Sequence, residues 1–443
     1  MSIETVPAAQ AGIQRSQWRV IILSSLGGAL EFYDFVIYSM FAQYIGAAFF
    51  PAADPLNSLL LSFTVFAVGY VARPVGGVVF SHFGDKYGRR RVFIIAMLTM
   101  SLATTAIGLL PTYAQWGIAA SACMVLLRLL QGFSLGGELP GAITYVVETA
   151  PRKAGFVAGF VFFCVNSGVA LASGLNLTVH KLLAEPDIAS WGWRLGFLFG
   201  GVFGLVSFWL RLSLEETHEF KQMRSVAARK PFGELVKSHP ANVAVGVAAL
   251  TATAGFNGLL FAMPALLPRT MNYTPGEASE AQYIGLIVLS LGMLFFGWLG
   301  DRMPRRWILG TGGLLMIFLA VPFFNAAANR TVDLNLLFVM AGVGASLVNG
   351  TMAGVVADLF PTRIRFSGVA VSFNLAFSIF SGIAPLAAAE LVKVFASPTA
   401  PAYYMCVCAA ITFIGSLFLH RYDGRILQSL RESERAITQP SIG

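Results

Sequence analysis

Apolar stretches of about 20 residues recur along almost the whole chain, and each is long enough to cross a hydrocarbon core of about 30 Å as a helix. Only 12% of the 443 residues are charged, against about 25% in soluble domains. This composition excludes most soluble folds and any nucleic-acid binder that relies on a basic surface. The sequence predicts an all-α polytopic membrane protein with twelve transmembrane helices, at residues 18–46, 56–81, 92–111, 116–147, 156–180, 191–211, 240–266, 281–299, 305–324, 333–357, 366–392 and 402–420.

Basic residues are divided unequally between the segments that connect these stretches. With the N-terminus inside, 23 of the 30 Lys and Arg residues fall on inner loops and tails, and only four fall on outer loops. Cytoplasmic loops of membrane proteins are enriched in Lys and Arg. We therefore expect a multi-pass protein of the plasma membrane (the inner membrane in a bacterium) with both termini in the cytoplasm.

Short motifs recur in the two halves of the chain. GDKYGRR at 84–90 is matched by GDRMPRR at 300–306, and ETAPR at 148–152 by DLFPTR at 358–363, with offsets of 216 and 210 residues. Nearly equal offsets indicate a parallel duplication of a six-helix unit. The expected domains are a cytoplasmic tail at 1–17, a six-helix bundle at 18–212, a cytoplasmic linker at 213–240, a second six-helix bundle at 241–421 and a cytoplasmic tail at 422–443.

Three further stretches, together with the loop GDKYGRRR and the six-plus-six layout, carry a family resemblance. They read ALEFYDF at 29–35, RLLQGFSLGGE at 128–138 and FPTRIR at 360–365. Over roughly residues 20–420 the chain resembles the major facilitator superfamily. Within it, the chain resembles the metabolite:proton symporter family of proline/betaine, citrate, α-ketoglutarate and shikimate carriers. The resemblance implies the major facilitator fold, with two six-helix pseudo-repeats, and we expect a functional monomer.

Two acidic residues lie within the first apolar stretch. Glu31 and Asp34 are three residues apart, so they share one helix face. Counting from Trp18 places Glu31 about 20 Å into the membrane, near its midplane. Intramembrane carboxylates usually face a cavity and act in ion or proton pathways. We expect at least one of the pair to carry the coupling proton; the alternative is that one only locks the helix to a neighbouring arginine.

Buried basic and polar side chains supply candidates for substrate binding. Arg128 lies at a similar depth to Glu31, and a planar guanidinium suits a carboxylate of the protein or of a substrate. Arg73 and Glu138 lie nearer the cytoplasmic side, where an ion pair between them is the structural alternative. Asparagines in membrane helices more often join helices than bind substrate. The substrate candidates are Arg128, Arg73, Tyr33, Gln131, Glu138, Asn257, Asn349 and Asn374.

The repeated loop motif suggests a gate at the cytoplasmic side. Its glycines permit a tight turn, Asp85 can lie against a helix N-terminus of the other half, and Arg89 can reach Glu148. Such contacts would hold this side closed in one state and break in the other; a plain topogenic loop is the alternative. This expectation rests largely on the resemblance. The expected gate residues are Gly84, Asp85, Gly88, Arg89, Arg90, Glu148, Asp301, Arg305 and Asp358.

Together these features predict a secondary transporter that couples inward proton flow to uptake of a small carboxylate-bearing metabolite by alternating access. Two alternatives stay open: a symporter of a zwitterionic osmolyte such as proline or betaine, and a proton-antiport exporter of drugs or siderophores. We expect no enzyme, cofactor or resident metal, because no metal-ligand cluster, nucleophile–base signature or phosphate loop occurs. The expected partners are a small-molecule substrate, protons and the lipid bilayer, with no nucleic acid.

Overall fold

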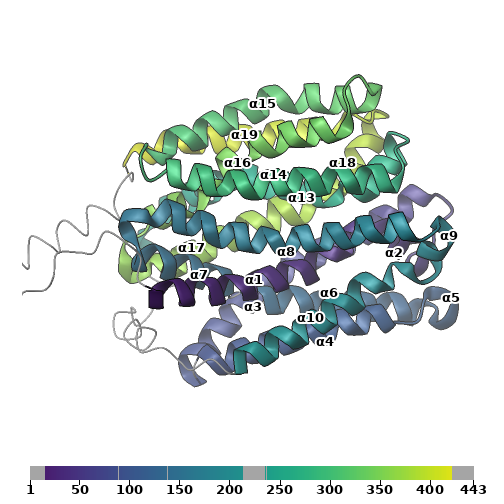
Figure 1. Cartoon of the computed structure of the whole chain (residues 1–443), viewed down its shortest axis with the longest axis horizontal. Helices are drawn as coiled ribbons and strands as arrows, with labels where there is room; N and C mark the ends of the chain where they lie inside the picture. The colour runs from purple at the N-terminus through teal and green to yellow at the C-terminus, as the bar shows by residue number, and fades with distance from the viewer. Residues whose placement is uncertain (1–14, 88, 137, 213–234, 236, 422–443) are drawn as a thin grey trace, which may run out of the picture.

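The computed structural model describes residues 15–87, 89–136, 138–212, 235 and 237–421, most of them in helices (Figure 1). The helices of the first half, in chain order, are α1 (Arg15–Met40), α2 (Ala42–Phe49), α3 (Pro55–Tyr87), α4 (Arg89–Leu109), α5 (Tyr113–Trp116), α6 (Ile118–Leu135), α7 (Glu138–Thr149), α8 (Ala154–Leu182), α9 (Glu185–Asp187) and α10 (Arg194–Leu212). Those of the second half are α13 (Pro240–Thr270), α14 (Pro275–Leu299), α15 (Arg305–Asn329), α16 (Leu334–Asp358), α17 (Thr362–Ala376), α18 (Gly382–Phe395) and α19 (Pro401–Phe418).

Within the described residues, nine helical stretches are long and apolar enough to cross a membrane. Two of these combine neighbouring elements: α6 with α7, and α17 with α18 through a π-helical turn at Phe377–Ser381. Two shorter apolar stretches, in α4 and α10, and the long helix α1 account for the remaining three of the twelve predicted spans. The all-helical architecture predicted from hydropathy is confirmed.

Helix α14 begins before the apolar stretch that predicted it, at Pro275 rather than residue 281. The hydroxyl of Thr274 accepts a hydrogen bond from the amide of Glu277, and the Glu277 carboxylate accepts one from the amide of Thr274. This capping box satisfies backbone donors that a helix start leaves without partners. The first turn is therefore polar, and a hydropathy pattern does not include it.

The helices form two groups, α1–α10 of the first half and α13–α19 of the second half. In Figure 1 the first group lies mostly in the lower part and the second mostly in the upper part, with α17 lower, beside α7. Helices α8 and α14 run side by side along the boundary between them. Within the first group, α3 and α6 approach so closely that a Cβ on Gly132 would lie 1.7 Å from the carbonyl oxygen of Gly69. Gly136 similarly lies against the carbonyl of Arg73. Such small-residue contacts let membrane helices pack backbone to backbone, and they bring Arg73 and Arg128 into the packed centre.

Parts of the predicted domain plan lie outside the described residues. They include 213–234 and 236 of the linker, 1–14 of the N-terminal tail and the whole C-terminal tail at 422–443. The domain boundaries remain predictions.

Candidate functional site

Arg128 lies in a box of aromatic rings inside the first group of helices. It is fully buried, and its guanidinium carbon lies 4.4 Å from the ring centres of both Phe35 and Tyr38 and 5.3 Å from that of Phe66. Nη1 donates to the carbonyl of Phe35 at 3.2 Å and to Oε1 of Gln131 at 2.7 Å. Nε and Nη2 donate to no acceptor among the described residues. The charge is stabilised by ring faces, and two donors stay available.

Asp34 is joined to this arginine by a chain of polar side chains. Its carboxylate is 3% exposed, and Oδ1 accepts no hydrogen bond from the described residues. The carboxylate lies near the side chain of Thr104. The Thr104 hydroxyl donates to the carbonyl of Met100 at 3.0 Å and accepts from Nε2 of Gln131 at 2.8 Å. Gln131 in turn accepts from Arg128. Thr104 and Gln131 therefore connect the buried acid to the buried guanidinium.

Arg73 lies between the two groups of helices and is 1% exposed. Its guanidinium carbon lies over four rings, at 5.8 Å from Phe32, 5.2 Å from Tyr70, 5.9 Å from Phe373 and 6.0 Å from Phe377. The first two rings belong to α1 and α3, whereas the other two belong to α17 and the π turn that follows it. The four rings form an aromatic cage that both halves of the molecule contribute to.

Glu31 is the acid associated with this cage. Its side chain is buried, and it attracts Arg73 electrostatically. Arg73 also interacts with the hydroxyl of Tyr70, while its Nε and Nη1 atoms find no acceptor among the described residues. The predicted acids thus separate: Glu31 associates with Arg73, and Asp34 connects to Arg128.

The other predicted substrate residues are dispersed. Tyr33 donates to a backbone carbonyl of α10, that of Gly196, at 2.8 Å. Asn257 donates to Asn349 at 3.2 Å, which joins α13 to α16 inside the second group. Asn374 donates to the carbonyl of Gly136 at 3.0 Å and thereby joins the two groups. These contacts are interhelical hydrogen bonds, the common role of such residues.

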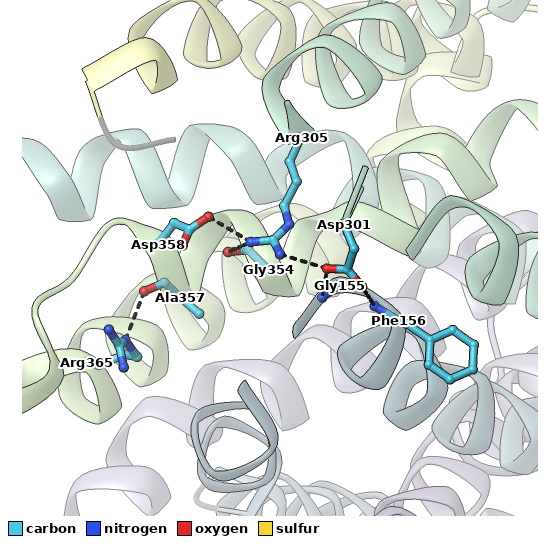
Figure 2. Close-up of polar contacts among 8 residues, drawn as sticks. All are labelled: Gly155, Phe156, Asp301, Arg305, Gly354, Ala357, Asp358 and Arg365. Atoms are coloured by element: carbon cyan, nitrogen blue, oxygen red, sulfur yellow. Dashed lines mark hydrogen bonds and ion pairs between the residues drawn. The ribbon is translucent and has the colours of Figure 1, made fainter. Parts of the chain in front are cut away.

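At one end of the bundle, Asp301 joins the two groups directly. Its Oδ1 accepts from the amide of Gly155 at 2.6 Å and its Oδ2 from the amide of Phe156 at 2.8 Å (Figure 2). These amides begin α8, where helix N–H groups have no acceptor within the helix. A carboxylate at a helix N-terminus also interacts favourably with the helix dipole. The second copy of the loop motif therefore holds a helix of the first half.

Two ion-pair systems surround this contact. Arg305 contacts Asp301 at 3.1 Å and Asp358 at 2.7 Å, both within the second group of helices (Figure 2). Arg365, in α17, contacts Glu148, in α7, at 2.8 Å and so crosses between the groups. Of the predicted gate residues, Glu148, Asp301, Arg305 and Asp358 thus lie at one end of the molecule.

Elsewhere, the two groups are joined along their length. The α8–α14 boundary carries three polar side-chain pairs, Asn166 with Ser290 at 2.7 Å, Ser173 with Gln282 at 2.9 Å and Asn176 with Ser279 at 3.1 Å. On the other side of the bundle, Ser378 donates to the carbonyl of Tyr70 at 2.7 Å and Ser381 to its hydroxyl at 3.0 Å. The two serine contacts hold Tyr70, one of the rings around Arg73.

Several predicted residues lie outside the described side chains. They are Gly84, Asp85, Gly88, Arg89, Arg90 and Glu138. Among the residues that are described, no group of three or more His, Cys, Asp or Glu side chains is placed to hold a metal ion.

Sequence reasoning missed several residues of these clusters, among them Arg365, Phe373 and Phe377. Arg365 ends the FPTRIR stretch, so that motif carried a signal for it. Phe373 and Phe377 are two of 37 phenylalanines, and no pattern distinguishes them from those that pack or face lipid.

Comparison with known proteins identifies the architecture. The model of the Major Facilitator Superfamily matches residues 22–385 and 245–440. The glycine betaine/proline/ectoine/pipecolic acid transporter OusA of Dickeya dadantii (strain 3937) is 35% identical over 419 residues, which cover 90% of this chain and 83% of the relative. The proline/betaine transporter of Escherichia coli (strain K12) is 31% identical over 428 residues, covering 93% and 85%.

Solved structures agree with this assignment at the level of the fold. The proton:xylose symporter XylE bound to 6-bromo-6-deoxy-D-glucose superimposes with a TM-score of 0.71 at 16% identity, covering 92% of this chain and 96% of that one. The chain belongs to the Major Facilitator Superfamily, as the sequence resemblance indicated. It is a multi-pass membrane transporter with the predicted twelve-helix fold, and not an enzyme.

Proposed function

We propose that this transporter takes up a zwitterionic osmolyte of the betaine or proline type together with protons, by alternating access. The names of the relatives described above include betaine and proline. They support this alternative over the carboxylate-bearing metabolite that the sequence first led us to expect, and they do not support an organic acid.

One observation carries the proposal: each of two buried guanidiniums is surrounded by aromatic rings and has N–H donors that find no acceptor in the part of the chain that the structure describes. A carboxylate is the natural acceptor for such donors. Ring faces carry negative electrostatic potential and attract cations, so they suit the ammonium end of a zwitterion. An anion with two or three carboxylates would gain nothing from these faces.

In this proposal the buried acids carry the proton. Asp34 is connected through Thr104 and Gln131 to Arg128, and Glu31 associates with Arg73. A substrate carboxylate that binds either arginine changes the charge balance at the acid connected to it. Occupancy by proton and by substrate would then depend on each other, which is the requirement for coupled transport.

The contacts of Asp301 and Arg365 with the first half are proposed to act as the cytoplasmic gate. The excess of basic residues on the loops predicted to be internal supports a cytoplasmic position for this end of the bundle. Both contacts cross between the halves, at 2.6 to 2.8 Å, so they must break when the halves separate at this end. Asp85 and Arg89 would act with them, as the repeat of the motif suggests.

A thermal-shift experiment on purified protein tests the substrate class, because a ligand that binds only the folded state raises apparent stability. Glycine betaine and proline should each stabilise the protein, whereas citrate, α-ketoglutarate and xylose should not. Stabilisation by citrate or α-ketoglutarate alone would contradict the proposal in favour of an organic acid. Stabilisation confined to drugs or carboxylate siderophores would favour the exporter.

A further inference from the structure

The aromatic cage around Arg73, formed by Phe32, Tyr70, Phe373 and Phe377, is built differently from the box around Arg128. The rings around Arg128 all belong to α1 and α3 of the first half. The cage instead takes two rings from each half. A cation in the cage therefore contacts both halves at once, and it stabilises the arrangement in which they are closed around it.

Local structure on the second-half side of the cage is specialised. Phe373 and Phe377 stack at 4.2 Å, and Phe377 begins the π-helical turn that separates α17 from α18. Single π turns inside helices occur frequently at functional sites, because the extra residue redirects side chains. Ser378 and Ser381 of this turn hydrogen-bond Tyr70. The turn thus fixes rings of both halves around one position.

The present occupant of the cage is incompletely satisfied. Arg73 is 1% exposed, yet its Nε and Nη1 atoms donate to no described acceptor. A buried donor without an acceptor is costly, and a guanidinium in contact with four rings has no room there for a hydration shell. A carboxylate brought to these donors would remove that cost. A cation without N–H groups would occupy the cage without creating unsatisfied donors.

We propose that the Phe32, Tyr70, Phe373 and Phe377 cage binds the ammonium group of the substrate, and that Arg73 fills the cage in the empty carrier. The inference rests on the proposed function and names the site for the cationic end of the osmolyte. When betaine binds, its quaternary ammonium, which has no N–H group, replaces the guanidinium among the rings. The displaced Arg73 then donates Nε and Nη1 to the carboxylate of the same substrate. Empty and loaded carriers can both close, because each has a cation between the halves.

Paired ligands isolate the contribution of the positive charge. Glycine betaine and tert-butylacetate have the same shape and the same carboxylate, but tert-butylacetate has a neutral carbon in place of the nitrogen. Binding of each is measured by calorimetry on the full-length protein in lipid nanodiscs. A desolvated cation–π contact of about 2 kcal/mol corresponds to roughly a 30-fold preference. We expect the wild-type protein to prefer betaine by at least about tenfold.

Replacing a ring should remove this preference selectively. In Phe373→Leu and Phe377→Leu, betaine affinity should fall so that the preference drops to about threefold or less, while binding of tert-butylacetate persists and reports folded protein. Phe380→Leu is the matched control, because Phe380 lies in the same π turn but outside the cage, and it should keep the wild-type preference.

Tetramethylammonium, a cation without a carboxylate, tests the role of Arg73. Arg73→Gln should weaken betaine binding, since the carboxylate loses its donors, but strengthen tetramethylammonium binding, since the cage is vacated. The gain should disappear when Phe377→Leu is added, which distinguishes the cage from a general loss of positive charge.

The outcomes separate the two proposals. If wild-type protein binds neither betaine nor proline, the proposed function is wrong and the assignment of the cage is wrong with it. If betaine binds but both phenylalanine variants keep the full preference over tert-butylacetate, the cage assignment alone is overturned. Equal loss of both ligands would also overturn it, since the rings would then only shape the pocket.

Discussion

The contact between Asp301 and the start of α8 allows a prediction with a defined magnitude. Asp301 accepts from the amides of Gly155 and Phe156 across the boundary between the halves, and its side chain is 12% exposed. Hydrogen bonds to a charged group contribute about 1.5–3 kcal/mol, against about 0.5–1.5 kcal/mol for neutral partners. Asp301→Asn keeps the shape and removes the charge. Because asparagine has one acceptor oxygen and an NH2 group in place of the other, one of the two bonds should be lost and the remaining one weakened. The change should cost at least about 2 kcal/mol, or roughly 30-fold in the equilibrium between joined and separated halves.

Hydrogen–deuterium exchange followed by mass spectrometry reports on the two amides themselves. In wild-type protein, peptides that begin near residue 151 should exchange slowly at 155 and 156. In Asp301→Asn, exchange at these positions should accelerate by about 10- to 30-fold, because the two amides spend a larger fraction of the time without an acceptor.

Asp333→Asn is the matched control. Asp333 also accepts from an amide in the first turn of a helix, that of Leu336 at 3.2 Å, but both residues lie in the second half. This variant should accelerate exchange near residue 336 and leave 155 and 156 unchanged. Unchanged exchange at 155 and 156 in Asp301→Asn would refute the reasoning, as would an equal acceleration there in the control.

Three further predictions concern the ion pair, the proton and the substrate. Glu148→Gln and Arg365→Gln should each increase opening of the gate end, measured as longer distances between spin labels on the two halves. A double-mutant cycle should give a coupling energy of about 1–3 kcal/mol between the two residues. Strictly additive effects would contradict a direct interaction. Asp34→Asn or Glu31→Gln should abolish substrate accumulation driven by a pH gradient but preserve counterflow exchange of substrate. If both variants still accumulate substrate under the gradient, the two acids have only a structural role. Arg73→Lys should weaken substrate binding about tenfold, because an ammonium loses the two-pronged contact with the substrate carboxylate; wild-type affinity would exclude Arg73 from the binding site.

Hydropathy was sufficient for the architecture because each span must bury its backbone polar groups within a helix. Hydropathy does not detect a polar first turn of a helix. The start of α14 at Pro275 is instead marked by the capping residues Thr274 and Glu277. It also gave no sign of the π turn at Phe377–Ser381, since a single inserted residue hardly alters a hydropathy average.

The candidate site was predictable only in part, for a physical reason. A charge inside a membrane span is rare and costly, so Glu31, Asp34, Arg73 and Arg128 could be selected from the sequence alone. What surrounds each charge depends on contacts between distant segments. Phe373 reaches Arg73 from a helix about 300 residues further along the chain, and no local pattern encodes that distance.

Uptake by purified protein in proteoliposomes tests the central claim most directly. With a lower pH outside than inside and no membrane potential, we predict that radiolabelled glycine betaine accumulates inside the proteoliposomes above its external concentration. A gradient of one pH unit, about 1.4 kcal/mol per proton, sustains up to about tenfold accumulation at one proton per substrate. A protonophore should abolish it. Betaine that only equilibrates across the membrane despite the gradient, or that is expelled as protons enter, would contradict proton-coupled uptake.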